Sequence, residues 1–344
     1  MNRFRKRPLI LICILISILL SSCTSNVQPK ERTYFNYFDT VSYIYSYANE
    51  SEAEFDKTCR EAVAIMDEYH KLFDIYNEYE GINNLCTLNR KAGKEAIELD
   101  DRLIDFLLYA KELCTKTSGE MNVMMGSVLR LWHSFREEAE GKGTVPAESR
   151  LNEAALHTSI ELLEINEAEK TARIADPDAA IDVGAVGKGY VAEIIASRLY
   201  ALGKESYVLN IGGNIRIIGN KPNGDGWVTG IKDPENLSSY AMKLTLSDTS
   251  CVTSGDYERY VEVDGIKYHH IIDKDTLMPA NYFRSVTVIC RDSALADALS
   301  TALFCMNYED GKSLVQSMQG VEAVWICPGG EIYATEGIEA LSVK

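Results

Sequence analysis

The sequence predicts an α+β fold (mixed α/β), with a helix-rich first half and a strand-rich second half. In residues 52–135, apolar side chains recur every three or four positions, as they do along one face of a helix. In residues 207–290, short apolar or alternating runs are separated by turns that contain glycine, which is typical of strands and hairpins. Helices followed by a group of strands, without regular alternation between the two, are typical of an α+β domain.

The expected elements follow from these spacings. Amphipathic helices are expected over residues 55–73, 103–114, 124–135, 151–163 and 191–199 and from 293 onward, with a short helix or turn over 82–89. Strands are expected over residues 37–47, 207–217, 227–231, 241–246, 260–263, 267–272 and 286–290, with a break at Gly212–Gly213 and a hairpin turn at Asp264–Gly265.

The N-terminal residues have the pattern of an export signal followed by a lipid attachment site. Basic residues at the start precede the apolar run 9–20, which is shorter than the roughly 20 residues of a transmembrane helix. Small residues then lead to Cys23, and a polar stretch follows it, as in the lipobox of bacterial lipoproteins. We expect a lipoprotein signal peptide at 1–22, a flexible tether at 23–32 that starts from lipidated Cys23, and one domain at 33–344. The mature protein is expected at the extracytoplasmic face of the cell membrane, anchored by its lipid.

Composition limits the kinds of partner. The 344 residues carry a formal net charge of -16, which argues against nucleic acid or an anionic membrane surface as a partner. An acidic protein that binds a phosphate-bearing ligand has to neutralise that ligand locally, which favours a bound cation. Seven cysteines follow Cys23 without a C-x-x-C pair, and we interpret them as thiols of the hydrophobic core.

The central motif is the glycine-rich segment Asp182–Tyr190, which lies between an apolar run and an amphipathic helix. Glycines allow a close backbone approach, and the start of a helix offers unpaired N–H groups and a partial positive charge. Lys188 adds a full positive charge, and Asp182 can accept a hydrogen bond from a ribose, a base edge or a ring N–H. The segment therefore predicts a phosphate site.

Three alternatives for this segment were open from the residues alone. A P-loop needs four residues between its first glycine and its Gly-Lys pair and then Ser or Thr, whereas here the spacer is two and Gly189 follows, which excludes it. Gly187, Gly189 and Ala192 match the G-x-G-x-x-A pattern of dinucleotide-binding proteins, although Asn214 stands near the place where an acidic ribose ligand is expected. The third alternative is a tight turn that binds no ligand.

Asp297 and Thr301 predict a cation site. They are four positions apart on an expected helix, so the carboxylate and the hydroxyl project from the same side, one turn apart. Both are hard oxygen donors of the kind that Mg²⁺ prefers. Capping and solvent contact are an equally simple explanation for such a pair when it stands alone.

Two adjacent histidines, His269 and His270, lie on an expected strand and therefore face opposite sides, so at most one of them points into a given site. Zinc is not expected, because the chain has five histidines and no H-x-x-x-H or C-x-x-C spacing. His270 is the candidate general base, with Asp256 or Asp273 as a candidate orienting partner. A structural histidine remains the alternative.

Six short motifs occur in a fixed order along the chain. They are Ser118–Asn122, Asp182–Gly189, Asn210–Asn214, Thr253–Tyr257, His270–Asp273 and Ala296–Thr301. In this order they resemble the ApbE family of FAD:protein FMN transferases, many of which are exported lipoproteins. The resemblance covers nearly all of the mature chain.

The resemblance implies an ApbE-like flavin transferase fold around a central FAD cleft. It implies FAD as the substrate and Mg²⁺ as the cofactor, with transfer of FMN to a Thr or Ser hydroxyl of a target flavoprotein and release of AMP. The implied partners are exported domains of membrane redox flavoproteins. The implied magnesium ligands are Ala185, through its carbonyl, Asp297 and Thr301. The implied FAD contacts are Phe38, Tyr76, Glu120, Met121, Asn122, Asp182, Lys188 and Ile271.

The chain departs from the family pattern at a few positions. Ala185 stands where glycine is frequent, and Met121-Asn122 replaces a common Phe-Asp or Leu-Asp. Lys274 and Leu277 interrupt the usual Asp-Pro-x-Thr-Gly, so the resemblance does not fix the shape of the loop after Asp273. Two other functions fit the same residues: an FAD pyrophosphatase that yields free FMN and AMP, and a lipoprotein that binds flavin without catalysis.

Overall fold

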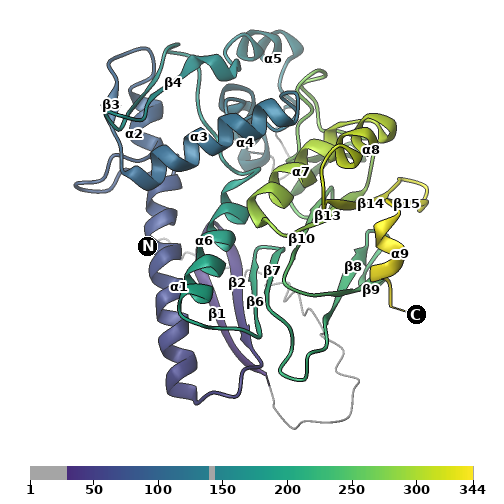
Figure 1. Ribbon diagram of the computed structural model, residues 1–344. Coiled ribbons are helices and arrows are strands. Elements are labelled where there is room, and N and C mark those ends of the chain that lie inside the picture. Colours follow the sequence, from purple (N-terminus) through teal and green to yellow (C-terminus); the bar gives the residue numbers. More distant parts are fainter. Residues whose placement is uncertain (1–28, 139–143, 344) are drawn as a thin grey trace, which may run out of the picture.

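The computed structural model describes residues 29–138 and 144–343, and it is built around an eight-stranded sheet (Figure 1). Neighbouring strands of this sheet are antiparallel. In spatial order they are β1 (Lys30–Tyr37), β2 (Thr40–Ser46), β6 (Tyr207–Ile211), β7 (Asn214–Ile218), β10 (Ser250–Gly255), β13 (Ser285–Cys290), β14 (Glu322–Ile326) and β15 (Ile332–Ala334). Smaller sheets are formed by β3 (Ile97–Glu98), β5 (Thr171–Ile174) and β4 (Leu163–Asn166), by β8 (Trp227–Asp233) and β9 (Asn236–Leu246), and by β11 (Tyr260–Val263) and β12 (Ile266–His269).

Helices dominate the first half of the described chain, as the sequence predicts. The helices of this half are α1 (Glu52–Phe73), α2 (Leu85–Arg90), α3 (Asp101–Lys116), α4 (Gly126–Glu138), α5 (Glu148–Ala155) and a 3-10 turn (Ile160–Leu162). The second half contains α6 (Gly187–Ala201), α7 (Ser293–Cys305), α8 (Tyr308–Gln316) and α9 (Gly337–Leu341). The predicted mixed α/β class is confirmed.

The large sheet is covered on both faces. Helices α6 and α7 lie side by side against one face, and the long helix α1 packs beside α6 (Figure 1). The β8–β9 hairpin and α9 pack against the other face. In β6, Leu209 faces the cluster that contains α1 and α6, whereas Val208 faces the cluster that contains β8 and β9. Because both faces of this strand are buried, its sequence is a continuous apolar run and does not alternate.

Several expected boundaries are wrong. The strand expected over 37–47 begins at Thr40 as β2, because Phe38 and Asp39 take φ values of 55° and 49° and turn the chain between β1 and β2. The strand expected over 267–272 ends at His269, so His270 lies just after β12. The helix expected over 151–163 ends at Ala155, and the chain reaches β4 at Leu163, where pairing with β5 overrides the local helical spacing. Strand β1 begins at Lys30, inside the segment expected to be a tether.

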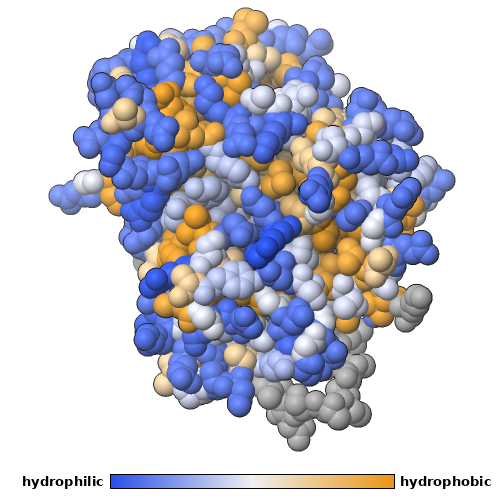
Figure 2. Space-filling model, viewed as in Figure 1, coloured by the Kyte–Doolittle hydropathy of each residue, from blue (hydrophilic) through white to orange (hydrophobic). Residues whose placement is uncertain are grey.

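The expected signal peptide and Cys23 lie outside the described residues. Within the described residues, no helix is both long and apolar enough to cross a bilayer. Six of the seven described cysteines are buried and none forms a disulfide, in agreement with their interpretation as core thiols. Figure 2 shows that the face bearing α6 and α7 is mainly hydrophilic, with apolar groups in separate small patches.

Candidate functional site

The candidate site lies where the first turn of α6 crosses α7. The backbone N–H of Gly189 donates a hydrogen bond to Oδ2 of Asp297 at 2.8 Å, across 108 residues of sequence. A Cβ atom at position 189 would lie 2.3 Å from the carbonyl oxygen of Ser293 and 2.5 Å from the Cβ of Asp297. Only glycine lets the two helices come this close. The glycine-rich segment and the Asp297/Thr301 pair therefore meet, as the sequence analysis requires.

Asp297 has the surroundings of a cation ligand. This residue is 4% exposed, and its carboxylate accepts a hydrogen bond from the N–H of Gly189. Burial raises the pKa of Asp297, while the positive charge of Lys188 and the N–H of Gly189 lower it. A buried carboxylate of this kind is costly without a positive partner.

Two further oxygen donors belong to the predicted cation site. Oγ1 of Thr301 follows Asp297 by one turn of α7 and lies 3.5 Å from Oγ of Ser254. Ala185 lies in the turn that leads directly into α6. Carboxylate, hydroxyl and carbonyl oxygens together form a hard donor set that suits Mg²⁺, so the residues present fit this ion.

The glycine-rich segment uses its backbone N–H groups inside the protein. The N–H of Gly184 donates to Oδ1 of Asp182 at 2.9 Å, and the N–H of Gly187 donates to the carbonyl of Val183 at 2.8 Å. The N–H of Gly189 is taken by the carboxylate on α7. The predicted phosphate cradle of backbone N–H groups is therefore wrong for these three donors, because a local turn and the crossing with α7 satisfy them first. Positive charge for an anion has to come from side chains.

Three cationic side chains supply that charge. Lys188 donates through Nζ to the carbonyl of Gly184 at 3.1 Å, and Arg259 donates through Nη2 to the carbonyl of Asp39 at 3.1 Å. Nη1 of Arg136, on α4, is buried and has no hydrogen-bond partner among the described residues. Burial lowers the pKa of Arg136, and the positive charge of Arg259 lowers it further.

The structure distinguishes the two histidines. The N–H of Ile271 donates to Nδ1 of His269 at 3.2 Å, so Nε2 of His269 carries the proton and donates to the carbonyl of Ala280 at 2.7 Å. His269 is thus a satisfied core histidine. Nδ1 of His270 is buried without a partner in the described chain. Burial and the charges of Arg259, Arg136 and Lys188 lower the pKa of His270 to about 3, so this histidine is neutral at physiological pH.

The expected orienting partners of His270 are engaged elsewhere. Oδ2 of Asp256 accepts from Nε of Arg284 at 2.7 Å. Oδ1 of Asp273 accepts from two backbone N–H groups of the following loop, each at 2.8 Å. The prediction that either carboxylate orients His270 is therefore wrong, because an ion pair holds the first and a turn holds the second.

In the loop after Asp273, Leu277 adopts a backbone conformation that is usual for glycine. Leu277 has a φ of 59°, in the left-handed region that favours glycine. Its N–H donates to the carbonyl of Asp273 at 2.8 Å, and its carbonyl accepts from Nε1 of Trp132 at 2.9 Å. The Leu277 side chain is buried beside Trp132 in the cluster under α4. Packing and these two bonds offset the backbone strain, so the departure from the family motif is accommodated.

The predicted contacts Phe38 and Tyr76 lie on loops at the edge of the cationic group. Phe38 occupies the β1–β2 turn next to Asp39, whose carbonyl binds Arg259. Tyr76 follows α1, is 52% exposed, and stacks on His133 of α4 with a distance of 5.4 Å between ring centroids. Burial of its hydroxyl, and then the charge of the nearby Asp182, raise the pKa of Tyr76 to about 12.

Four other predicted FAD contacts are partly or fully buried, or are engaged by other groups of the protein. Glu120 is partly buried and lies 3.2 Å from Nζ of Lys274; burial raises the pKa of Glu120 while Lys274 opposes the shift. Nδ2 of Asn122 donates to a backbone carbonyl at 2.8 Å. The side chains of Met121 and Ile271 are buried in two separate hydrophobic clusters, so in this structure they belong to the core.

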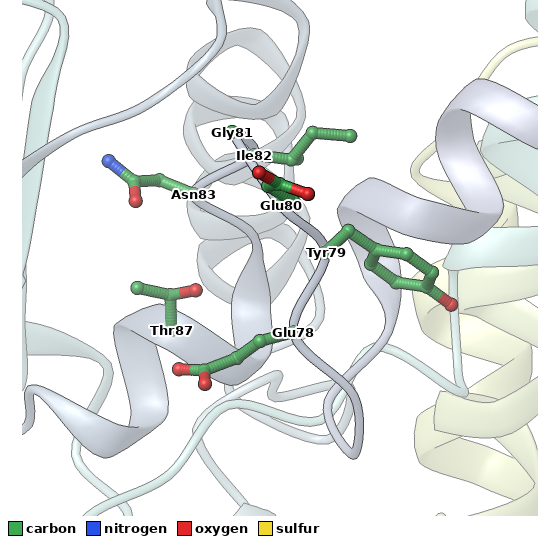
Figure 3. Close-up of a pocket in the computed structure, with 7 residues that line it drawn as sticks. All are labelled: Glu78, Tyr79, Glu80, Gly81, Ile82, Asn83 and Thr87. Carbon is green, nitrogen blue, oxygen red and sulfur yellow. The ribbon is translucent and has the colours of Figure 1, made fainter.

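A separate hollow of about 600 Å³ lies on the loop between α1 and α2 (Figure 3). Its lining includes Glu78, Glu80 and Asn83, and Figure 3 shows the Tyr79 side chain pointing away from the other labelled residues. None of the predicted site residues lines it. Its acidic lining does not suit a phosphate-bearing ligand, so it is not the candidate site.

Sequence reasoning missed Arg136 and Arg259. Arg136 lies on a helix identified only by its apolar spacing, and Arg259 lies in the segment that follows the Thr253–Tyr257 motif. Isolated arginines carry no spacing signal. The clue available was indirect: an acidic chain that binds phosphate needs basic side chains near its glycine-rich turn.

A buried carboxylate suited to a cation, a neutral histidine and a group of unpaired cations define the class: an enzyme-like site for a phosphate-bearing ligand. The chain belongs to the ApbE family, whose model matches residues 38–325. This confirms the resemblance inferred from the six motifs.

Individual relatives agree. The FAD:protein FMN transferase of Treponema pallidum is 30% identical over 346 residues, which cover 96% of this chain and 93% of the relative. The FAD:protein FMN transferase of Vibrio cholerae is 31% identical over 72% of this chain and 73% of its own. Among solved structures, the ApbE protein of Thermotoga maritima superposes with a TM-score of 0.82 at 26% identity, covering 92% of this chain and all (100%) of that chain. The flavin transferase ApbE of Vibrio cholerae gives 0.77 at 26% identity, covering 91% and 100%. The predictions of an ApbE-like fold and of a flavin-transferase enzyme are confirmed.

Proposed function

We propose that this chain transfers the FMN moiety of FAD to a Thr or Ser hydroxyl of a target flavoprotein, in a reaction that requires Mg²⁺ and releases AMP. The observation that carries the proposal is the buried carboxylate of Asp297, held against the start of α6 and close to the positive charge of Lys188. The substrate, FAD, is inferred from the relatives named FAD:protein FMN transferase.

Each side chain has a role in this reaction. Asp297, Thr301 and the carbonyl of Ala185 would hold Mg²⁺, which when bound neutralises charge that develops on the bridging phosphates. Lys188 attracts the pyrophosphate as a point charge. Nδ1 of His270 is buried and has no hydrogen-bond partner among the described residues, so this nitrogen is available to accept a proton from the attacking hydroxyl.

The flavin and the adenosine need apolar and aromatic surfaces. Tyr76 is exposed and Phe38 lies on a turn, so both are placed on loops that can adjust around a planar ring. Asp182 has one carboxylate oxygen engaged by the N–H of Gly184, which leaves the other as an acceptor for a ribose, a base edge or a ring N–H.

The test uses the purified protein with FAD, Mg²⁺ and a panel of candidate acceptor domains, with covalent FMN measured by mass spectrometry. Asp297→Asn is expected to abolish transfer, whereas Asp105→Asn, at an exposed carboxylate on α3, is expected to leave it unchanged. Free FMN and AMP without a modified acceptor would instead support an FAD pyrophosphatase. Recovery of intact FAD would support a flavin-binding lipoprotein without catalysis.

We also propose that lipidated Cys23 anchors the enzyme at the extracytoplasmic face of the cell membrane, where exported domains of membrane redox flavoproteins would be its acceptors. The basic start, the apolar run and the polar segment after Cys23 support this localisation. Cys23→Ser should release the protein from the membrane fraction and remove the lipid mass from its N-terminal peptide. Unchanged fractionation of this variant would contradict the anchor.

A further inference from the structure

Arg136 and Arg259 are unusual among the arginines of this acidic protein. Most described arginines pair with a carboxylate, for example Arg216 with Glu193 at 3.0 Å and Arg284 with Asp256 at 2.7 Å. Arg259 instead donates to a backbone carbonyl, and Nη1 of Arg136 is buried with no partner in the described chain.

The two arginines converge on His270 from different elements. Phe135, which precedes Arg136 on α4, packs on Tyr268 of β12 with 5.5 Å between ring centroids, and Tyr260, which follows Arg259, pairs with His269. Lys188 comes from α6. All three positive charges act on His270, and the two arginines act on each other. Asp182 and Glu137 are the opposing charges that act on Arg136. Three cations therefore gather around one histidine in a protein whose formal net charge is -16.

Such an arrangement is costly in the unliganded protein. The like charge of Arg259 disfavours the charged form of the partly buried Arg136, and a buried N–H donor without an acceptor loses the hydrogen bond it would make to water. Both costs are relieved by an anion that accepts from the guanidinium groups. Arginine suits a phosphate because its planar N–H groups match two phosphate oxygens at once.

The position of His270 identifies which phosphate. This step rests on the proposed function. In the proposed transfer, the acceptor hydroxyl oxygen forms a bond to the FMN-side phosphorus, and the bond from that phosphorus to the bridging oxygen breaks. The bonding pair leaves with AMP, and the hydroxyl proton passes to the base. A base has to lie within hydrogen-bonding reach of the attacking hydroxyl, so the FMN-side phosphate lies next to His270.

We propose that Arg136 and Arg259 bind the non-bridging oxygens of the FMN-side phosphate beside His270 and stabilise the charge that develops there during transfer. They are catalytic residues in this assignment, in addition to Lys188 and the cation ligands of α7. The site therefore selects flavins that carry a phosphate ester over riboflavin.

Binding of three flavins to the full chain tests this assignment. Dissociation constants for FAD, FMN and riboflavin are measured by flavin fluorescence for the wild type, Arg136→Met and Arg259→Met. Arg130→Met is the matched control, because Arg130 is exposed on the same helix α4. Each of the two test substitutions is expected to weaken FMN and FAD binding by about 10- to 100-fold and to leave riboflavin binding unchanged. Arg130→Met is expected to change none of the three.

Kinetics provide the second readout. Transfer by Arg136→Met should fall by a larger factor than FAD affinity does, because part of the interaction forms only in the transition state. Arg136→Lys should recover part of the affinity but little of the rate, since a point charge replaces a planar fork. Circular dichroism and melting temperature establish folding, and the exposed Arg259 keeps the test available if Arg136→Met does not fold.

The outcomes separate this inference from the proposed function. An unchanged ratio of FMN to riboflavin affinity in both variants would overturn the phosphate assignment even if transfer is normal in the wild type. A rise in the KM of the acceptor alone would also overturn it, by assigning the arginines to a carboxylate of the acceptor. Failure of the wild type to modify any acceptor would count against the proposed function, while the FMN-to-riboflavin ratio would still decide the role of the arginines.

Discussion

Replacement of Gly189 by alanine tests the crossing of α6 and α7 directly. The new Cβ would lie 2.3 Å from the carbonyl oxygen of Ser293 and 2.5 Å from the Cβ of Asp297. Both are main-chain or near-main-chain atoms, so they cannot move aside as the end of a flexible side chain would. The helices have to separate, and the 2.8 Å bond from the Gly189 N–H to the carboxylate has to lengthen or break.

The size of the effect follows from these two contacts. Forcing an extra methyl group into a packed contact costs about 1 to 3 kcal/mol. Loss of a hydrogen bond to a charged group costs a further amount of about 1.5 to 3 kcal/mol. Alanine recovers less than about 1 kcal/mol through its higher helix propensity. We therefore expect Gly189→Ala to lower the free energy of unfolding by roughly 1.5 to 6 kcal/mol, as follows from these ranges.

Urea unfolding of the wild type, Gly189→Ala and Gly329→Ala measures this difference. Gly329 is the control because a Cβ there meets no atom within 4 Å and its φ lies outside the left-handed region. Covalent FMN transfer is measured in parallel and should fall at least about tenfold in Gly189→Ala, because the Asp297 carboxylate is displaced. A change in stability below about 0.5 kcal/mol together with full activity would refute the close crossing.

Three further predictions concern charged groups. Mg²⁺ at 100 times its Kd should raise the free energy of unfolding of the wild type by about 2.7 kcal/mol. The same Mg²⁺ should leave the free energy of unfolding of Asp297→Asn unchanged. An equal rise in both proteins would contradict the cation site. Arg216→Met should lower the free energy of unfolding by about 1 to 3 kcal/mol, because it removes a buried guanidinium group that pairs with the partly exposed carboxylates of Glu193 and Asp248. Arg291→Met, which removes a cation that is 77% exposed, should change it by less than about 1 kcal/mol; equal losses would contradict this reasoning. The pKa of His270 is lowered to about 3 in the folded protein, so below pH 6.5 the unfolded chain takes up a proton that the folded chain does not. Without ligand, the loss of stability between pH 6.5 and 5.0 should be about 2 kcal/mol smaller in His270→Gln, and parallel curves would exclude the lowered pKa.

Local structure was largely predictable from the sequence. Helix α1 follows from its apolar spacing, and its start has a capping box in which Ser51 and Glu54 satisfy each other's backbone N–H groups. The placement of Asp297 and Thr301 on one face of α7 follows from helical geometry alone. The family follows from six ordered motifs, since their order is independent of how the chain folds.

Predictions about partners of particular groups were less successful. The N–H of Gly189 was expected to bind phosphate, yet it binds a carboxylate 108 residues away. Phe38 was expected near the start of a strand, yet it turns the chain with a φ of 55°. In both cases local propensity leaves several conformations open, and contacts with distant residues select one of them.

The sequence by itself determined the fold class, most of the helices and strands, the family, and the chemical types of donor available for a phosphate and a cation. Only the tertiary structure decided that His270 and not His269 faces the site, and that Arg136 and Arg259 join Lys188 around it. The physical reason is that periodicity and capping depend on neighbours within a few residues. The charge and hydrogen bonding of a site depend instead on which side chains packing brings together from distant parts of the chain, here α4, the segment before β11, and α6.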